Sequence, residues 1–279
     1  MSQNHFDLLV TLDHRYLHPL AVMLTSLRRA HPFDSFDVYI LHKNLSEAHI
    51  VSLQDVLHDE FMTFHPIAVD DSALFAAPTS KRYPKAIYYR LFASQYLPKT
   101  LDRILYLDPD IIVQNPIDFL YDLPFEGAYY IGASHLFKSL QRLNEIRLKL
   151  AKNSPYLNTG VLLINLAELR LHLDPLAIIA FIEKKRAKLM LPDQDILSTL
   201  YGDKIRVVDS LVFNLSDRYL RIYNRHAEKS GQPTFQLDWV RKHTVFVHYC
   251  GRNKPWKEEY VGTLGVLYWE AESYLGRAR

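Results

Sequence analysis

Short apolar runs alternate with segments of helical periodicity along the first seventy residues. A helix is predicted over 16–29, where apolar residues recur three and four positions apart. A second helix is predicted from Ser46, a residue type that caps helices well, to Leu57. The apolar runs that predict β-strands on either side of these helices are 6–12, 36–41 and 61–67.

The alternation resumes after a polar segment, 70–84, which Pro78 and Pro84 interrupt and which is predicted as a loop. The nearly continuous apolar run 103–107 is typical of a strand that is buried on both faces of a parallel sheet. Further strands are predicted at 129–133, 160–166 and 245–248, and further helices at 85–96, 140–152, 175–188 and 193–200. The order of elements predicts an α/β fold with a largely parallel sheet in one domain, followed by a tail rich in aromatic and charged residues.

Charge and composition narrow the classes of partner. Thirty-three basic and 31 acidic residues give a formal charge of +2, which argues against a nucleic-acid partner. The single cysteine, Cys250, excludes an intrachain disulfide and fits a reducing cytoplasm. The first twelve residues lack the pattern of a signal peptide, and no apolar stretch approaches 18 residues, so no transmembrane helix is expected.

Two carboxylates directly follow the apolar run 103–107. Asp108 and Asp110 are two positions apart, so in an extended chain both side chains lie on the same side and can face one cation. Such a pair at the carboxyl end of a strand suits Mg²⁺ or Mn²⁺ bound together with a diphosphate. The alternative is a simple turn, because Asp-Pro-Asp is also common turn chemistry.

A second polar motif follows the predicted strand 245–248. His248 ends the strand, and Gly251 and Lys254 follow three and six positions later. The histidine can complete a metal site, the glycine permits close approach of a phosphate to the backbone, and the lysine can neutralise a phosphate oxygen. A lone histidine that only makes a hydrogen bond at the end of a strand is the alternative interpretation.

Two further segments have both a structural and a functional interpretation. Pro192, Asp193 and Gln194 precede an apolar helical pattern, as expected of a helix start with an acid near its positive end. The same side chains could form a polar cluster for sugar hydroxyls and a reaction centre. Asn158, Thr159 and Gly160 form a polar turn before a buried strand, and the simpler interpretation is a loop.

Taken in order, these segments resemble the family 8 retaining glycosyltransferases, which include bacterial lipooligosaccharide galactosyltransferases and glycogenin. The resemblance extends over residues 6–256, and its best-matching stretches are LYLDPDIIV, NTGVLLINL, DQDIL and HYCGRNKPW. It implies a GT-A fold, with a Rossmann-like, mostly parallel central sheet flanked by helices. It also implies a glycosyltransferase domain over 1–256 and a small C-terminal helical tail, 257–279, packed on the domain or facing a membrane.

The resemblance also assigns candidate ligands for a metal and a nucleotide. Asp108, Asp110 and His248 would bind Mn²⁺, or Mg²⁺ in its place, which bridges the diphosphate of UDP. Gly251 and Lys254 match the positions that bind the diphosphate. The positions that match residues around the uridine are Thr11, Asp13 and Tyr16, with Asp13 near the uracil and Tyr16 available to stack.

Around the donor sugar, the matching residues are Arg90, Asn158, Asp193 and Gln194, and the last two are the catalytic candidates. Gln194 would lie next to the anomeric carbon. Three departures from the family pattern stand out. Arg15 replaces a frequent asparagine near the ribose and Thr159 replaces a frequent alanine, while His135 stands where a relative has an acidic acceptor contact.

The activity that follows from this resemblance is transfer of glucose or galactose from UDP-glucose or UDP-galactose, with retention of configuration, in the synthesis of cell-surface saccharides. The acceptor would be a glycan, a glycolipid or a glycoprotein, and the protein would be cytoplasmic, with peripheral membrane contact through the tail as one alternative. A non-catalytic UDP-sugar-binding protein of the same fold is the main rival. A haloacid-dehalogenase-like phosphatase also opens with Asp-x-Asp, but its motif normally begins the chain, and Ile112 stands where that family carries Thr or Val.

Overall fold

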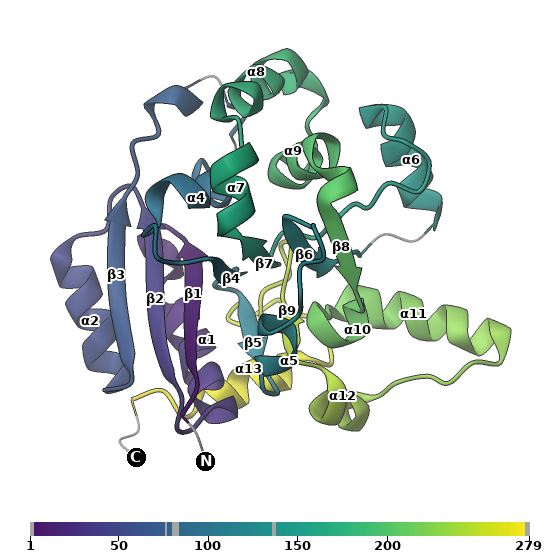
Figure 1. Cartoon of the computed structure of the whole chain (residues 1–279). Helices are drawn as coiled ribbons and strands as arrows, with labels where there is room; N and C mark the ends of the chain where they lie inside the picture. Colours follow the sequence, from purple (N-terminus) through teal and green to yellow (C-terminus); the bar gives the residue numbers. More distant parts are fainter. Residues whose placement is uncertain (1–2, 76, 80–83, 136–137, 277–279) are drawn as a thin grey trace.

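A seven-stranded sheet with the strand order β3-β2-β1-β4-β7-β6-β8 forms the centre of the protein (Figure 1). The computed structural model describes residues 3–75, 77–79, 84–135 and 138–276. The strands are β1 (His5–Thr11), β2 (Ser35–His42), β3 (Met62–Ala68), β4 (Arg103–Leu107), β6 (Tyr130–Ala133), β7 (Val161–Asn165) and β8 (Ile205–Val208). Only β7 runs against its neighbours among these strands, so the prediction of a mostly parallel sheet is confirmed.

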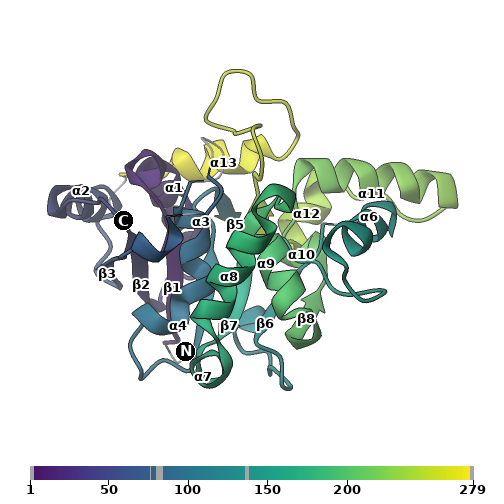
Figure 2. The ribbon, with the colours of Figure 1, turned by 90° about the horizontal axis from the view of Figure 1, so that it is seen from above.

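Alternating side chains of the first strands build two apolar layers, one on each face of the sheet. Leu8, Val10 and Val38 lie on the face covered by α1 (Leu17–Ala30) and α2 (Glu47–Leu57). Leu9 and Tyr39 lie on the opposite face. Figure 2 shows the helices on both sides of the sheet, and those on the second face are α3 (Ala86–Tyr89), α4 (Ala93–Tyr96), α7 (Leu166–His172), α8 (Pro175–Lys185) and α9 (Pro192–Leu200).

A second, two-stranded sheet connects the middle of the chain to its late part. β5 (Ile111–Val113) pairs antiparallel with β9 (Phe246–His248), and Ile111 lies opposite His248. Residues more than 130 positions apart in sequence therefore meet directly beyond the carboxyl end of β4. The remaining helices are α5 (Asp118–Tyr121), α6 (Lys138–Leu148), α10 (Ser210–Phe213), α11 (Asp217–Ser230), α12 (Leu237–His243) and α13 (Gly265–Glu272).

The elements predicted from apolar periodicity are present with small shifts, apart from one helix. The predicted helix 85–96 was wrong as a single element, because a 3₁₀ turn at Arg90–Phe92 separates α3 from α4. Its tighter backbone coincides with an arginine that is turned into the interior, where Arg90 is 5% exposed. Strands β5 and β8 and helices α5, α7, α10, α11 and α12 were not predicted. Of the predicted loop 70–84, residues 76 and 80–83 lie outside the described residues.

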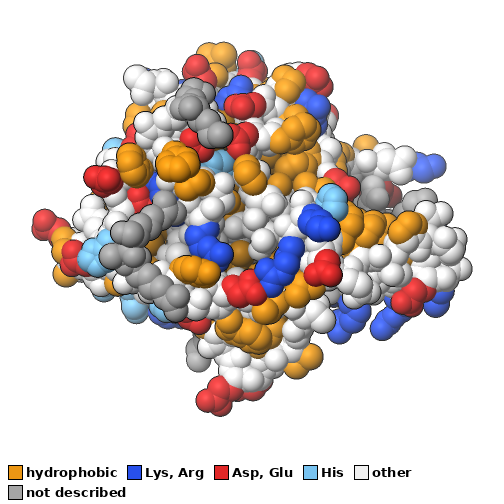
Figure 3. Space-filling model, turned by 90° about the horizontal axis from the view of Figure 1, so that it is seen from below, with side chains coloured by type: hydrophobic (Ala, Val, Ile, Leu, Met, Phe, Trp, Pro, Cys, Tyr) orange, Lys and Arg blue, Asp and Glu red, His pale blue; other side chains and the backbone are white. Residues whose placement is uncertain are grey.

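Helix α13, in the C-terminal tail, packs on the domain. Its buried residues Leu267, Tyr268 and Ala271 join Val22 of α1 and Ile112 of β5 in one apolar cluster. Within the described residues, no helix is both long and apolar enough to cross a membrane. Basic, acidic and apolar side chains are interspersed on the face shown in Figure 3, in keeping with the balanced charge of the sequence.

Candidate active site

Asp108 and Asp110 lie where the central sheet meets the two-stranded sheet. The backbone N–H of Asp108 donates to the carbonyl of Gly160 at 2.8 Å, at the start of β7. The carbonyl of Asp110 accepts from the N–H of Tyr249 at 3.0 Å, just after β9. Because β7 is antiparallel, its beginning lies at the carboxyl edge of the parallel strands, where open α/β sheets bind ligands.

The three predicted metal ligands come together at this edge. Nε2 of His248 lies 3.6 Å from Oδ2 of Asp108 and 3.2 Å from Oδ1 of Asp110. One donor atom from each of the three residues lies within 4.8 Å of the other two. Their oxygen and imidazole donors suit a divalent cation such as Mn²⁺.

The surroundings of these side chains fit a metal ion as well. Oδ1 of Asp110 is buried and accepts no hydrogen bond from the described residues. Nδ1 of His248 lies 2.9 Å from Oδ1 of Asn214 and donates to it, which leaves the lone pair of Nε2 directed at the two carboxylates. Gly160 leaves the space open, since a Cβ there would lie 2.2 Å from Cε1 of His248 and 2.8 Å from Oδ2 of Asp108.

Two cations flank the carboxylates. Lys254, which is 6% exposed, forms an ion pair with Asp110 and also donates to the carbonyl of Tyr249 at 2.8 Å. Burial alone would raise the pKa of Asp110, but the charge of Lys254, with a contribution from His248, outweighs it and holds that pKa well below the ordinary value. Burial would lower the pKa of Lys254, and Asp110 outweighs that effect, so the pKa is raised. The pair therefore stays ionised at neutral pH.

Arg90 is the second cation, and it joins Asp108 to Asp193. Its Nη2 lies 3.0 Å from Oδ1 of Asp108, and its Nη1 lies 3.4 Å from Oδ2 of Asp193 and donates to the carbonyl of Thr159 at 2.8 Å. Thr159 also donates its hydroxyl to Oδ2 of Asp193 at 2.6 Å. Burial raises the pKa of Asp193, although Arg90 and this hydroxyl work against it.

Asn158 is tied to the same cluster through Asn214. Its Oδ1 accepts from the N–H of Gly160 at 3.0 Å and from Nδ2 of Asn214 at 3.2 Å. Nδ2 of Asn158 lies 3.4 Å from Nδ1 of His135, whose Nε2 donates to the carbonyl of Asn214. His135 is thus part of the support of His248, a role that its sequence context did not suggest.

The residues predicted for the uridine lie at the end of β1 and in the turn after it. The hydroxyl of Thr11 lies 3.0 Å from that of Tyr106, which donates to Oδ1 of Asp108 at 2.5 Å. The ring of Tyr16 lies 6.0 Å from Nζ of Lys254 and meets the edge of Trp256 at 6.1 Å. The structure thus connects Thr11 and Tyr16 to the metal ligands.

Asp13, Gly251 and Gln194 are less closely connected to the cluster. Arg15 binds the carboxylate of Asp13 with two hydrogen bonds, from Nε at 3.0 Å and from Nη2 at 2.6 Å. Gly251 has a φ of 93°, a conformation that a residue with a Cβ rarely adopts, in the loop between His248 and Lys254. Gln194 follows Asp193 in the first turn of α9 and is partly exposed.

Two residues at the centre of the cluster were missed by the sequence reasoning. Asn214 is fully buried and binds the side chains of both His248 and Asn158. It lies in a stretch without a recognisable motif, so no pattern pointed to it. Tyr106 lies inside LYLDPD, but a tyrosine within an apolar strand reads as a core residue, and only the structure shows its hydroxyl on Asp108.

Comparison with known proteins identifies the family and the fold of the chain. A family model described as glycosyl transferase family 8 matches residues 7–260. Lipopolysaccharide 1,2-glucosyltransferase of Escherichia coli is 29% identical over 255 residues, covering 88% of this chain and 72% of that protein. Lipopolysaccharide 1,3-galactosyltransferase of Salmonella typhimurium is 26% identical over 281 residues, covering 96% and 78%.

A solved structure with the same fold is that of the galactosyltransferase LgtC in complex with donor and acceptor sugar analogues. It matches with a TM-score of 0.81 and 25% identity over 98% of both chains. The central sheet and its flanking helices thus form the GT-A fold. The family match extends over both the Asp108–Asp110 pair and the His248–Lys254 segment, and the chain belongs to glycosyl transferase family 8.

Proposed function

We propose that this protein is a retaining hexosyltransferase that uses a UDP-sugar and a divalent metal, Mn²⁺ or Mg²⁺. The observation that carries the proposal is the convergence of Asp108, Asp110 and His248 around a buried carboxylate oxygen that accepts no hydrogen bond from the described residues. Three carboxylates, counting Asp193, face two cations, Lys254 and Arg90. This excess of negative charge favours a bound metal ion.

The chain's own groups then bind the donor. A bound divalent ion would neutralise charge that develops on the diphosphate leaving group. Lys254, already beside Asp110, supplies a second positive charge for a phosphate oxygen, and Gly251 lets the backbone approach it. Tyr16, next to Lys254, offers its ring for stacking. Asp13 lies near the uracil, and Thr11 also contacts the uridine.

The sugar is held by side chains on the other side of Arg90. Asp193 is already fixed by Arg90 and Thr159, so it is suited to accept hydrogen bonds from sugar hydroxyls and poorly placed to act as a nucleophile. Gln194 lies next to the anomeric carbon and stabilises it without forming a covalent bond. Asn158 is the remaining side chain around the donor sugar. The bond between the anomeric carbon and the diphosphate oxygen breaks, and the acceptor oxygen bonds to that carbon on the same face, through a short-lived oxocarbenium-like species, so configuration is retained. The proton of the acceptor hydroxyl passes to the departing diphosphate.

The relatives guide the choice of substrates. Their names give glucosyl and galactosyl transfer to lipopolysaccharide, so UDP-glucose or UDP-galactose is the proposed donor. The proposed acceptor is a glycolipid or polysaccharide precursor at the cytoplasmic face of a membrane, with a glycoprotein as the other acceptor class. A membrane contact through the tail would use its exposed apolar side chains, because the buried face of α13 is covered by the domain.

Substitution of exposed tail residues tests the proposed contact between the C-terminal tail and a membrane. Val261 and Trp269 are 78% and 49% exposed. We expect the full chain to float with liposomes and Val261→Ser/Trp269→Ser to float less, with transfer to a short soluble acceptor unchanged. Equal flotation of both proteins, or none by either, would contradict a contact through this tail.

The activity is tested by the release of UDP from a panel of UDP-sugars in the presence of Mn²⁺. We expect release from one hexose donor, abolished by EDTA and by Asp110→Ala. The variant Asp203→Ala, which removes an exposed acid in the turn before β8, is the control and should keep full activity. NMR of the product's anomeric proton then reports retention.

A different result separates the rival interpretations. If no donor is hydrolysed with any acceptor, calorimetry with UDP-glucose and UDP-galactose distinguishes a binding protein from a wrong assignment. Binding of a UDP-sugar that requires Mn²⁺ and is lost in Asp110→Ala, without turnover, would favour the non-catalytic alternative. Release of inorganic phosphate from a phosphomonoester, without sugar transfer, would favour a phosphatase.

A further inference from the structure

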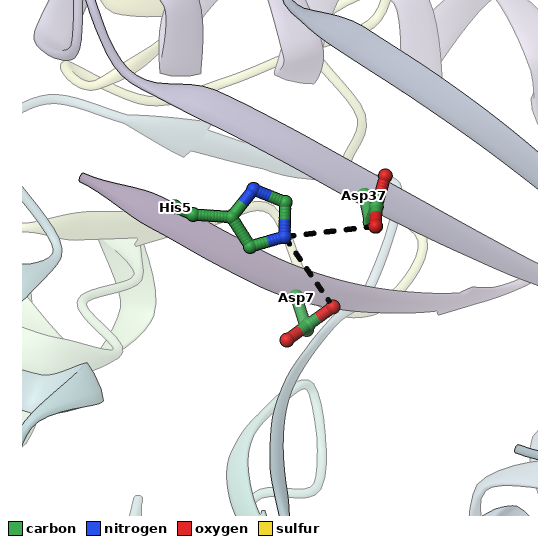
Figure 4. A group of neighbouring side chains, drawn as sticks. All are labelled: His5, Asp7 and Asp37. Atoms are coloured by element: carbon green, nitrogen blue, oxygen red, sulfur yellow. Dashed lines mark ion pairs between the residues drawn. The ribbon is translucent and has the colours of Figure 1, made fainter. Parts of the chain in front are cut away.

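A second cluster of metal-ligand side chains lies at the amino ends of the strands, remote from the active site at their carboxyl ends. His5 and Asp7 of β1 are two residues apart and share one face of the sheet, and Asp37 of β2 lies directly beside Asp7 in the parallel register. Figure 4 shows the imidazole of His5 between the two carboxylates. Its Nε2 lies 3.8 Å from Oδ1 of Asp7 and 3.6 Å from Oδ2 of Asp37.

These separations suit a metal better than they suit hydrogen bonds. Both exceed the length of an N–H···O bond. Two ligand atoms on a tetrahedral Zn²⁺ ion, each at about 2.1 Å, are roughly 3.4 Å apart, so a small adjustment would complete the geometry. The three donor atoms lie within 4.8 Å of one another.

Each of the three side chains has a polar neighbour at its other polar atom, which for Asp37 is an ion-pair contact without a hydrogen bond. Nδ1 of His5 lies 2.9 Å from the hydroxyl of Ser35, and Oδ2 of Asp7 accepts from the hydroxyl of Tyr121 at 3.4 Å. Oδ1 of Asp37 lies 3.2 Å from Nε2 of His65. Such outer partners orient the ligands of metal sites and leave the inner atoms directed at one point.

His65 is itself positioned and adds a fourth donor at the edge of the cluster. Its ring stacks on that of Tyr39, with centroids 4.6 Å apart and an interplanar angle of 17°. The cluster carries two carboxylates close together, those of Asp7 and Asp37 on neighbouring strands. A bound cation would relieve this repulsion.

A similar group elsewhere shows what a purely structural arrangement looks like. His31, Asp34 and Asp118 also bring three donor residues together. There, Nδ1 of His31 lies 2.7 Å from Oδ2 of Asp34, and Nε2 accepts from the N–H of Ile117 at 2.9 Å. Both ring nitrogens are engaged, so no lone pair remains for a metal. Nε2 of His5, in contrast, has no such donor among the described residues.

We propose that His5, Asp7 and Asp37 form a site for a divalent transition-metal ion, with Zn²⁺ as the ion that their imidazole and carboxylate donors fit. His65 orients Asp37 or becomes the fourth ligand, and water takes any remaining position. The site is independent of the sugar-transfer centre, because its residues come from the opposite ends of the strands. A metal here would tie β1 to β2.

The test measures Zn²⁺ binding to the full chain by equilibrium dialysis, with the active site as an internal reference. We expect two Zn²⁺ ions for the native protein, one of which is lost in His5→Gln and the other in His248→Ala. His172→Gln is the matched control, because its histidine also pairs with one carboxylate, Glu168, and is equally exposed. It should leave both ions in place. Ser35→Ala should lower the Zn²⁺ affinity of the site at His5 about tenfold.

Crystals soaked in Zn²⁺ provide a second readout, the position of the anomalous peak. A peak between His5 and Asp37 supports the site. Native and His5→Gln proteins that bind equal amounts of Zn²⁺, with no such peak, would overturn the proposal. His5 is half exposed, so His5→Gln is expected to fold, and a thermal melt of the metal-free variant checks this. Donor hydrolysis by His5→Gln should match the native rate.

Discussion

At the scale of single residues, the candidate site depends on side chains that lie behind the proposed metal ligands. Asn214 binds His248 through its oxygen and Asn158 through its nitrogen, so one buried amide sets the orientation of two functional side chains. His135 fixes the backbone of the same residue, because its Nε2 donates to the carbonyl oxygen of Asn214. The orientation of His248, a predicted metal ligand, therefore depends on its hydrogen bond to Asn214.

Removing the amide of Asn214 should weaken metal binding. We expect Asn214→Ala to raise the Mn²⁺ concentration needed for half-maximal donor hydrolysis by about ten- to a hundredfold, because His248 loses its orientation. Saturating Mn²⁺ should restore much of the rate. A fall in rate with an unchanged Mn²⁺ requirement would show that Asn214 acts in another way. Thermal melts without metal exclude loss of the fold as the cause.

His135 should make the stability of the protein depend on pH. Burial lowers the pKa of His135 to about 4, against about 6.5 in an unfolded chain. Because the folded pKa is the lower one, the neutral ring favours the fold. This contribution is complete above about pH 6.5 and is lost as the pH falls toward 4. We expect urea unfolding to show a loss of up to about 3 kcal/mol over this window.

His135→Gln keeps a hydrogen-bond donor near Asn214 but does not titrate. Its free energy of unfolding should therefore fall less steeply between neutral pH and about pH 4 than that of the native chain. Equal slopes for the two proteins would assign the acid sensitivity to other groups.

At the scale of elements, the apolar patterns predicted most strands of the central sheet well, but they did not predict the two-stranded sheet or helix α11. β4 was predicted with its observed bounds because a continuous apolar run leaves little ambiguity. β5 has three residues and its partner arrives from residue 246, so no local pattern marks it. Helix α11 buries only Leu220 and Ala227, and a segment with so few apolar residues does not stand out as part of a hydrophobic core.

The candidate site residues could likewise be predicted where they form a local sequence motif, and not where they depend on long-range packing. Motifs contiguous in sequence, such as Asp108 with Asp110, were found, and the structure brings His248 to them. Asn214 depends on packing between α10 and β9, which no local pattern encodes. Arg15 was noted as a departure near the ribose, but its two hydrogen bonds to Asp13 emerged only in the structure.

The turn that begins β7 should tolerate no side chain at Gly160. A Cβ would overlap the imidazole of His248, so we expect Gly160→Ala to lower donor hydrolysis by at least about a hundredfold. Gly202→Ala is the matched control, since a Cβ there meets nothing within 4 Å. Near-native activity of Gly160→Ala would mean that the space between residue 160 and the side chain of His248 is wider in solution.

Helix α6 is attached to α9 by one buried ion pair. Arg147 reaches both oxygens of the fully buried Asp195, at 2.8 and 2.6 Å, and Tyr156 donates to the same carboxylate at 2.7 Å. We expect Arg147→Ala to lower the free energy of unfolding by about 3 kcal/mol, because a buried charge loses its partner. Arg142→Ala, an exposed change on the same helix, should have little effect in the same urea titration. Similar losses for the two variants would contradict this.

At the scale of the whole molecule, the C-terminal tail is part of the core. Leu264, Leu267 and Tyr268 are buried against β5, β9 and α1. Removal of residues 257–279 should leave a chain that does not fold, because each large apolar side chain contributes roughly 2 kcal/mol.

A milder variant tests the same packing in a folded chain. Leu267→Ala should lower the free energy of unfolding by about 3 kcal/mol, and Val261→Ala, at a position that is 78% exposed, should leave it unchanged. A truncated chain that melts like the native one would show that the tail is an independent element.

The pairing of β5 with β9 also bears on how the protein is made. The strands β1, β2 and β3 are neighbours in sequence as well as in the sheet, so they can form while the rest of the chain is still on the ribosome. Asp108 and Asp110 emerge at mid-synthesis, but His248, Asn214 and Lys254 follow only after a further hundred residues or more. Until β9 pairs with β5, the carboxylates have no imidazole or lysine beside them. We therefore expect a nascent chain to lack a complete metal site until residues 246–254 have been synthesised and β9 has paired with β5.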